Sequence, residues 1–485
     1  MHRALFTLAF AALMAGAAPV RAGGDDLRWL QRTGFGVDAA AVQSLQRLGP
    51  SRYLDAQLGP EQPLPASVQA QIDAMPISST GIAALFAQAD TLKAAIDAAQ
   101  SDADKQAAKK AHGAFEQDVL QQAMQRNLLR AIHSPDPLRQ KLVWFWFNHF
   151  NVFSGKNNGR LLIPDYEENA IRPYALGRFR DLVMATLKHP AMLVYLDNAQ
   201  NAAGKLNENY ARELMELHTL GVDGGYTQAD VQALARILTG VSVNLRGEAR
   251  PRAAMQPGYL HEGAFEFIPR RHDWGDKVLL GQTIKGTGFD EVETAVTLLC
   301  RQPATARHIS QQLATYLLGS PADPQLVARM TETFQRSDGD IAATVRVLFR
   351  SPQARSAPPF YTDPYRYVVS ALRQGYDGQT LGNVQPAINW LNQQGEPLYG
   401  RLTPDGYPLD GDAWASDGQM VKRFEVARAI AGGRAPLAPS STPTPSYQWR
   451  FAQSAGVQTR NVLDRATSPT EWNLLWLSAP EMNHD

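Results

Sequence analysis

Apolar residues recur at helical spacing along most of this chain, with helix-favouring residues between them. Residues 80–132 are rich in Ala, Leu, Gln, Lys and Glu, which lose little side-chain freedom in a helix. We therefore predict two long helices there, separated near Ser101 and Asp102 and ended by Pro135 and Pro137. Further helices are predicted over residues 138–147, 165–187 (with a joint at Pro173), 190–197, 208–220, 289–300, 303–318, 324–335, 340–349, 363–373 and 419–430.

One more helix is predicted after Thr227. Thr227 is a good N-cap residue, and Asp230 three positions later completes the pattern of a capping box. Gly240 suits the position just after the helix end. The apolar residues between them share one helical face and are Val231, Leu234, Ala235 and Leu238.

Residues 244–288 break this pattern, since they contain more glycine, proline and aromatic residues and fewer helix formers. We expect an irregular excursion there, with a short hairpin around residues 277–284. No repeat of fixed period and no clear domain linker occurs, and residues 435–446 are rich in Pro, Ser and Thr, as in a surface loop. The predicted fold is therefore mostly α, a large helical bundle forming a single domain over residues 23–485.

The first 22 residues have the three-part pattern of a secretory signal peptide. His2 and Arg3 precede an apolar run over residues 4–18, and small residues then lead to Ala22. The alternative is a membrane anchor, but the run is shorter than the roughly 20 residues that span a bilayer. We expect cleavage near Ala22 and a periplasmic or secreted protein.

Charge and cysteine content narrow the function. The chain has 47 basic and 47 acidic side chains, so nothing favours nucleic acid as a partner. No second apolar run is long enough to span a membrane. The single cysteine, Cys300, cannot form an internal disulfide, and its apolar neighbours indicate a buried, inert thiol.

Residues 207–218 hold the densest group of chemically useful side chains. Tyr210, Leu214 and Leu217 share a narrow apolar stripe, and Glu213 lies at its margin. Burial beside such a stripe raises the pKa of a carboxyl group, whereas a neighbouring Arg212 lowers it. The plainer alternative is a solvated helix face with an intrahelical Glu208–Arg212 pair, worth a few tenths of a kcal/mol.

Other polar residues outside this helix favour a site. The candidate sugar-stacking residues are Trp274, Trp390, Tyr399 and Trp414, although such residues more often lie in the core. His149, His218 and His272 with several acids would suit a divalent metal, but no His-Glu-x-x-His spacing occurs. We therefore predict no metal and no other cofactor. The chain also lacks a Gly-x-Ser-x-Gly elbow, a dinucleotide fingerprint and the lysine of a phosphate loop.

Several motifs resemble a family of unknown function numbered 1800 (DUF1800). The best match is NENYARELMEL at residues 207–217, and others are WFWFNHF at 144–150, IRP at 171–173 and HPAM at 189–192. The resemblance implies a helical, exported protein. It also implies a co-exported partner that resembles sulfatases and phosphatases, because genes of the two families are often neighbours. One departure is Phe147, where the family usually has histidine; a metal role there is thereby weakened.

Two hypotheses remain. The first is an exported hydrolase, a glycoside hydrolase acting on a polysaccharide through paired carboxyl groups. The second is a non-catalytic protein of the cell envelope that binds a glycan or a partner. For the hydrolase, Glu213 is the preferred member of the pair, with Arg212 or His149 setting its pKa. The candidate catalytic residues are Glu213, Glu208, Glu216, Asp197, Asp165 and Glu168, and the candidate substrate-binding residues are Asn148, His149, Arg212, Asn209, His272, Asp273 and Trp414.

Overall fold

The structure, a computed structural model, describes residues 24–249, 255–433 and 455–485. It is mostly α-helical, as the sequence predicts. The predicted signal peptide and the Pro/Ser/Thr-rich residues 435–446 lie outside the described residues. The first helices are α1 (Gly24–Arg32), α2 (Ala39–Gln57), α3 (Ala66–Asp73), α4 (Ile82–Ala98), α5 (Asp102–His133) and α6 (Pro137–His149), with a 3-10 turn η1 (Pro76–Ser78).

The middle of the chain consists of shorter helices and turns. The predicted joint at Pro173 is a 3-10 turn that follows a π-helical turn. The elements in order are α7 (Gly159–Asp165), η2 (Tyr166–Ile171), η3 (Arg172–Tyr174), α8 (Phe179–Lys188), α9 (Pro190–Tyr195), η4 (Asn198–Gln200), α10 (Asn209–Glu216) and α11 (Gln228–Ile237). The predicted capping box of Thr227 and Asp230 is confirmed at the start of α11.

Residues 241–284 form two small antiparallel sheets rather than an irregular excursion with one hairpin. The predicted hairpin is confirmed as β4 (Lys277–Leu279) and β5 (Gln282–Ile284). The sequence prediction missed a second sheet of order β1-β3-β2, made of β1 (Val241–Val243), β2 (Leu260–Glu262) and β3 (Phe265–Phe267). Strands of three residues are too short to show an alternating pattern. A 3-10 turn, η5 (Pro269–Arg271), follows them.

The C-terminal half returns to helices, close to the predicted ranges. They are α13 (Phe289–Cys300), α14 (Pro303–Leu318), α15 (Pro324–Arg336), α16 (Ile341–Arg350), α17 (Gln353–Ser356), α18 (Pro364–Gly375), α19 (Gln385–Gln393), the turn η6 (Gly411–Ala413), α20 (Asp417–Ala431), α22 (Val457–Leu463), α23 (Pro469–Leu477) and α24 (Pro480–Asn483).

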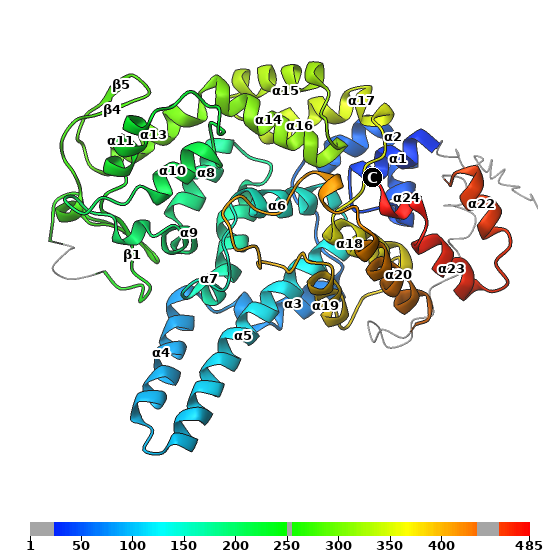
Figure 1. Cartoon of the computed structure of the whole chain (residues 1–485), viewed down its shortest axis with the longest axis horizontal. Coiled ribbons are helices and arrows are strands. Elements are labelled where there is room, and N and C mark those ends of the chain that lie inside the picture. The colour runs from blue at the N-terminus through cyan, green and yellow to red at the C-terminus, as the bar shows by residue number, and fades with distance from the viewer. Residues whose placement is uncertain (1–23, 250–254, 434–454) are drawn as a thin grey trace, which may run out of the picture.

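The core is centred on α6 and α18, whose residues are all buried. Trp144 of α6 stacks on Tyr365 of α18 with ring centroids 4.5 Å apart. The end of the chain closes onto this core, because Asp485 pairs with Lys141 of α6 at 2.9 Å and with Arg366 of α18 at 3.3 Å. Figure 1 shows the C-terminus beside α1 and α2. These contacts fix the helix end at Asn148 and His149, from which the candidate site is built.

The helical pair α4–α5 extends away from the rest of the molecule (Figure 1). It is the pair predicted for residues 80–132, and Ser101 caps α5 by accepting from the backbone N–H of Asp104. None of the helices within the described residues combines the length and apolar character that a bilayer crossing requires.

Candidate functional site

Glu213 lies on α10, a helix held by its apolar side. Tyr210, Leu214 and Met215 are buried, whereas Glu213 is half-buried on the adjoining side. The helix is shorter than predicted, because the carbonyl of Glu213 accepts from the N–H groups of both Leu217 and His218 and the last turn loosens. The Glu213 side chain therefore lies near the C-terminal end of a short, well-anchored helix.

Burial raises the pKa of Glu213, and the neighbouring charges add to this effect on balance. The negative charge of Glu216 raises the pKa, Arg212 lowers it by a smaller amount, and Asp405 raises it further. A carboxyl group in such surroundings keeps its proton to a higher pH than usual. The sequence prediction that Arg212 tunes Glu213 agrees with this direction, but Asp405 was not among the candidates.

Asp405 belongs to a loop formed by residues 401–409, called here the 401–409 loop. Arg401 holds its carboxylate through one terminal nitrogen, at 3.1 Å from Oδ1 and 3.0 Å from Oδ2. The Tyr195 hydroxyl donates to the carbonyl of Leu402 in the same loop at 2.8 Å. Burial, followed by the charges of Asp405 and Glu213, raises the pKa of Tyr195 to about 12. Tyr195 is thus an electrostatic neighbour of both carboxyl groups.

The 401–409 loop is fastened to the end of α6. The side-chain amide of Asn148 donates to the carbonyl of Tyr407 at 2.9 Å and accepts from its N–H at 2.6 Å. Asn151 donates to the carbonyls of Arg401 and Thr403. Gly406 lies against Asn148 so closely that a Cβ would stand 2.3 Å from its backbone oxygen. Asn148, a predicted substrate-binding residue, is therefore engaged in positioning the loop.

A cavity of about 320 Å³ separates this loop from the ends of α6 and α10. His149 lines it, with Nδ1 2.7 Å from the side-chain amide of Gln312 and Nε2 3.1 Å from the carbonyl of His218. Burial, followed by the charge of His308, lowers the pKa of His149 to about 4, so its ring is neutral at neutral pH. The remaining wall includes Gln312, Leu217, Arg401, Asp405 and Tyr407.

The other candidates of the 207–218 segment lie around this site but are paired. Glu208 is bound by Arg212 at 3.1 Å and by Gln228 at 2.7 Å on the outer surface. Asn209 donates to the carbonyl of Leu196, and Glu216 accepts from the hydroxyl of Tyr226 at 3.3 Å. The structure therefore contains the intrahelical Glu208–Arg212 ion pair that the plainer alternative predicts.

Asp197 is linked to Tyr195 through Lys156. Its carboxylate pairs with Lys156 at 2.9 Å, and the ammonium of Lys156 is 5.5 Å from the centroid of the Tyr195 ring. The side chains of Lys156 and Asp197 are 34% and 39% exposed, so this ion pair adds little to stability. It supplies a donor and an acceptor at the edge of the site.

Glu168 lies elsewhere, among arginines of α5 and η3. It pairs with Arg126, Arg130 and Arg172. Burial raises the pKa of Glu168, but the hydrogen bond and charge of Arg130, with Arg126 and Arg172, outweigh burial and lower it to about 2. A carboxylate held so firmly in its charged form suits helix packing and not proton transfer.

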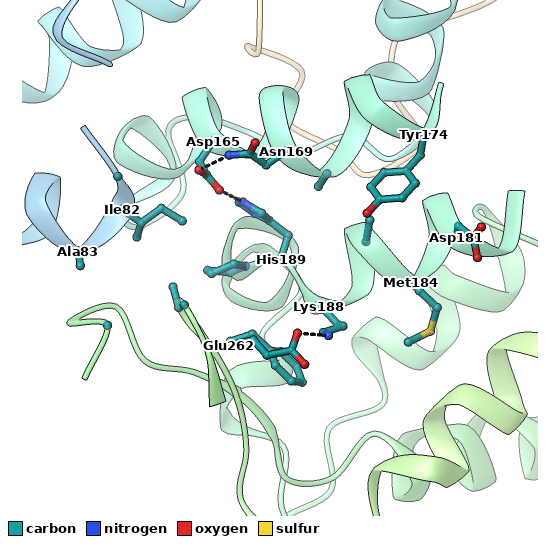
Figure 2. Close-up of a pocket in the computed structure, with 18 of the residues that line it drawn as sticks. Ile82, Ala83, Asp165, Asn169, Tyr174, Asp181, Met184, Lys188, His189 and Glu262 are labelled. Carbon is teal, nitrogen blue, oxygen red and sulfur yellow. Dashed lines mark hydrogen bonds and ion pairs between the residues drawn. The ribbon is translucent and has the colours of Figure 1, made fainter. Parts of the chain in front are cut away.

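Asp165 lines a recess of about 840 Å³. Figure 2 shows its carboxylate between His189, at 2.9 Å, and Asn169, at 2.6 Å, with the Lys188–Glu262 pair across the recess. The His189 Nδ1 accepts from the N–H of Ala191, so Nε2 carries the proton given to Asp165. Although burial raises the pKa of Asp165, these hydrogen bonds lower it overall.

His272 and Asp273 lie in a third place, beside β4. His272 Nε2 is 2.7 Å from Glu291 Oε1, and the other oxygen of Glu291 is 2.6 Å from Lys277 Nζ, all fully buried. Asp273 accepts two hydrogen bonds from Arg236. These bonds, with the N–H of Gly275 and the positive charges of Arg236 and Lys277, lower the pKa of Asp273 to about 2. These groups therefore satisfy one another through hydrogen bonds and ion pairs.

Trp414 packs against the 401–409 loop. It is buried, its Nε1 donates to the carbonyl of Pro408 at 3.1 Å, and its ring is 6.1 Å from that of Tyr407. Its indole therefore presents no open face for sugar stacking. Of the predicted residues, Glu213 and Glu216 act on each other through their charges, and Asn148 and His149 line the cavity together with Asp405. Other partners hold Asp165, Glu168, His272 and Asp273.

No group of three or more His, Cys, Asp or Glu side chains suited to a metal ion occurs within the described parts of the chain. His149 lies near His218 and His308, with ring centroids 5.9 and 6.3 Å away, but no carboxylate completes that set. The donor set of this site is therefore one of carboxyl, phenol and guanidinium groups.

The fold and the site define a mostly helical protein with a half-buried carboxyl group, Glu213, and a small cavity that His149 and Asp405 line. The chain belongs to the DUF1800 family, whose model, described as a protein of unknown function, matches residues 28–484. The resemblance seen in the sequence motifs is thereby confirmed. No curated protein and no solved structure shows a significant match to the chain.

Proposed function

We propose that this protein is an exported hydrolase that cleaves a polysaccharide, with Glu213 and Asp405 as its pair of carboxyl groups. Glu213 would protonate the leaving oxygen, and Asp405 would activate water or attack the sugar. The observation that carries the proposal is the contrast between the two groups. Burial and nearby negative charge raise the pKa of Glu213, whereas Arg401 binds both oxygens of Asp405.

Such a contrast is what acid and base roles require. A general acid must hold its proton near the working pH, and its partner must stay ionised. Partial burial favours the protonated form of Glu213, and the guanidinium of Arg401 donates hydrogen bonds to both oxygens of Asp405. The pair keeps Glu213 but takes its second member from outside the acids considered in the sequence, which were Glu208, Glu216, Asp197, Asp165 and Glu168.

Neighbouring groups suit the recognition of sugar hydroxyls. The Lys156–Asp197 pair and the Glu216–Tyr226 hydrogen bond offer donors and acceptors near Glu213. Leu402, 67% exposed, adds an apolar surface at the loop. The proposed chemistry uses no metal and no other cofactor.

The proposal is tested by offering the purified protein a panel of neutral and acidic polysaccharides and measuring released reducing ends. Glu213→Gln and Asp405→Asn should each lose at least about a hundredfold in turnover, the scale of general acid–base catalysis. Glu208→Gln is the matched control, because Glu208 is the N-cap residue of the same helix and is paired at the surface. Activity that survives both Glu213→Gln and Asp405→Asn excludes the pair.

A second candidate function is non-catalytic binding of a glycan or a partner. The 840 Å³ recess favours it, because Asp165, His189, Lys188 and Glu262 on its walls are all paired with one another (Figure 2). Paired side chains of this kind fix a shape and bind through their remaining lone pairs without exchanging protons. A protein that binds a polysaccharide of the panel but never cleaves it, in any of these variants, belongs to this class.

A further inference from the structure

Arg180, in the first turn of α8, has a guanidinium group without a partner among the described residues. No hydrogen bond or ion pair to it occurs there, and its Nε is buried and unsatisfied. Its neighbours differ: Arg178 and Arg301 each bind one oxygen of Asp338, at 3.1 and 3.0 Å. Both oxygens of Asp338 are therefore engaged by Arg178 and Arg301, and Arg180 acts on this carboxylate through its charge alone, without a hydrogen bond. A partly buried donor without a partner costs free energy, so its retention calls for a ligand.

Arg180 also lies where three recesses adjoin. It lines the 840 Å³ recess, a small recess of about 250 Å³ and a third of about 640 Å³. The small recess has Phe179 and Phe334 on its walls, together with Arg301 and Asp338. Because the small and the third recess share Arg180, Thr297 and Arg301, one ligand can enter both.

The side chains around Arg180 differ between the small recess and the third recess. In the small recess two arginines face one carboxylate, that of Asp338, so an anionic group gains charge balance there. In the third recess the free side chains are the amide of Gln282 and the carboxylates of Asp290 and Glu293, none of which has a hydrogen bond to the described residues. Carboxylates and amides are the usual acceptors and donors for sugar hydroxyls, and they oppose a second negative charge.

We propose that the recesses around Arg180 bind an acidic sugar, with a single uronate carboxylate or sulfate ester on the Arg180 guanidinium. The hydroxyl-rich body of the sugar then lies along Gln282, Asp290 and Glu293. A guanidinium presents its donors in a fixed fork that matches a carboxylate or sulfate. This site is separate from Glu213 and does not depend on the proposed hydrolysis.

Replacing an arginine that serves to bind a ligand should change the melting temperature differently from replacing a structural arginine. Arg180 makes no hydrogen bond or ion pair to the described residues that its loss would break, so Arg180→Gln should leave the melting temperature of the free protein unchanged or raise it. A structural arginine behaves in the opposite way. Arg301→Gln should lower the melting temperature, because it removes one of two partners of Asp338.

The test is a calorimetric titration of the full chain with a tetramer of galacturonic acid, a sulfated tetrasaccharide and neutral cellotetraose. Binding of either acidic probe, but not of cellotetraose, is expected, and the stronger of the two tells carboxylate from sulfate. Arg180→Gln should weaken that binding about tenfold to a hundredfold, the range for a hydrogen bond to a charged group. Arg180→Lys should give an intermediate loss, since it keeps the charge without the fork.

Two variants serve as controls. Arg178→Gln removes an exposed neighbour on the same Asp338 and should leave the affinity within about twofold, and Glu213→Gln should leave it unchanged even though it stops the proposed hydrolysis. Three results overturn the proposal: no acidic probe binds, the neutral probe binds equally well, or Arg180→Gln binds as the wild-type chain does. If Glu213→Gln alone abolishes binding, the titration reports the other site and Arg180 has no such role.

Discussion

The negative charge of Asp405, on the 401–409 loop, helps to raise the pKa of Glu213 on α10, although the two residues lie far apart in the sequence. Burial and the charge of Glu216 contribute more than Asp405 does. The relationship depends on the contacts between Asn148 and the backbone of Tyr407, which hold the loop over the end of α6. The electrostatics of Glu213 can therefore be altered from the loop without touching α10.

Asp405→Asn should lower the pKa of Glu213, because it removes a like charge and leaves burial unchanged. The carboxyl carbon of Glu213, followed by NMR through a pH titration of labelled protein, measures this directly. Asp412→Asn is the control, since Asp412 is exposed on the following turn and does not act on Glu213. An unchanged or raised pKa in Asp405→Asn would show that the two groups do not sense each other.

Gly406→Ala should destabilise the protein and disturb the loop, because the new Cβ would stand 2.3 Å from the backbone oxygen of Asn148. Gly395→Ala is a matched control: its φ is also positive, +83° against +73°, but nothing lies within 4 Å of its Cβ. Both variants carry backbone strain of about 1 kcal/mol. Gly406→Ala should lose about 1–3 kcal/mol more in urea unfolding. Equal losses of unfolding free energy in the two variants would mean that the 401–409 loop shifts to accommodate the new Cβ without an energetic penalty.

Glu168→Gln should lower the free energy of unfolding by about 2 kcal/mol or more, since it leaves Arg126, Arg130 and Arg172 facing a neutral group. Glu208→Gln breaks only one surface pair and should cost less than about 0.5 kcal/mol. Chemical denaturation of both variants measures the difference. If Glu168→Gln instead folds as stably as wild type but loses polysaccharide cleavage, Glu168 is catalytic after all.

Stability should fall as the pH drops below neutrality. Burial lowers the pKa of His133 and of His149 from 6.5 to about 4. Between these two values the unfolded chain binds the protons and the folded chain does not. Each histidine therefore removes about 1.4 kcal/mol of stability per pH unit as the pH falls from 6.5 towards 4.

Urea unfolding at pH 7 and at pH 5 tests this prediction, and His149→Gln should reduce the difference. The carboxylates act in a lower window: Glu168, whose pKa is lowered to about 2, loses its contribution only as the pH falls from 4.5 towards 2. Equal stability of the wild-type chain at pH 7 and pH 5 would contradict neutral, buried histidines.

The sequence predicts those features that depend on neighbouring residues. The capping box of Thr227 and Asp230, the helix pair over residues 80–132 and the β4–β5 hairpin are all set by local chemistry and are all confirmed. The half-burial of Glu213 follows from its place beside the Tyr210–Leu214 stripe. Each of these signals lies within a few residues of the structure that it predicts.

The parts of the site that the sequence does not predict depend on contacts between residues far apart in the chain. Asp405 and Gly406 look in the sequence like an ordinary turn, and contacts from the distant residues Asn148, Asn151 and Tyr195 hold this loop in place. Glu168 looks like Glu213 until α5 supplies Arg126 and Arg130. The one local hint was Arg401 four positions before Asp405, a spacing that allows the observed ion pair.

The most direct test of Glu213 as the general acid compares turnover and binding in one variant. With a polysaccharide at saturating concentration, Glu213→Gln should keep its affinity for the substrate and its melting temperature while kcat falls at least about a hundredfold. Unchanged kcat in Glu213→Gln, with Glu208→Gln equally active, would contradict an acid role for Glu213.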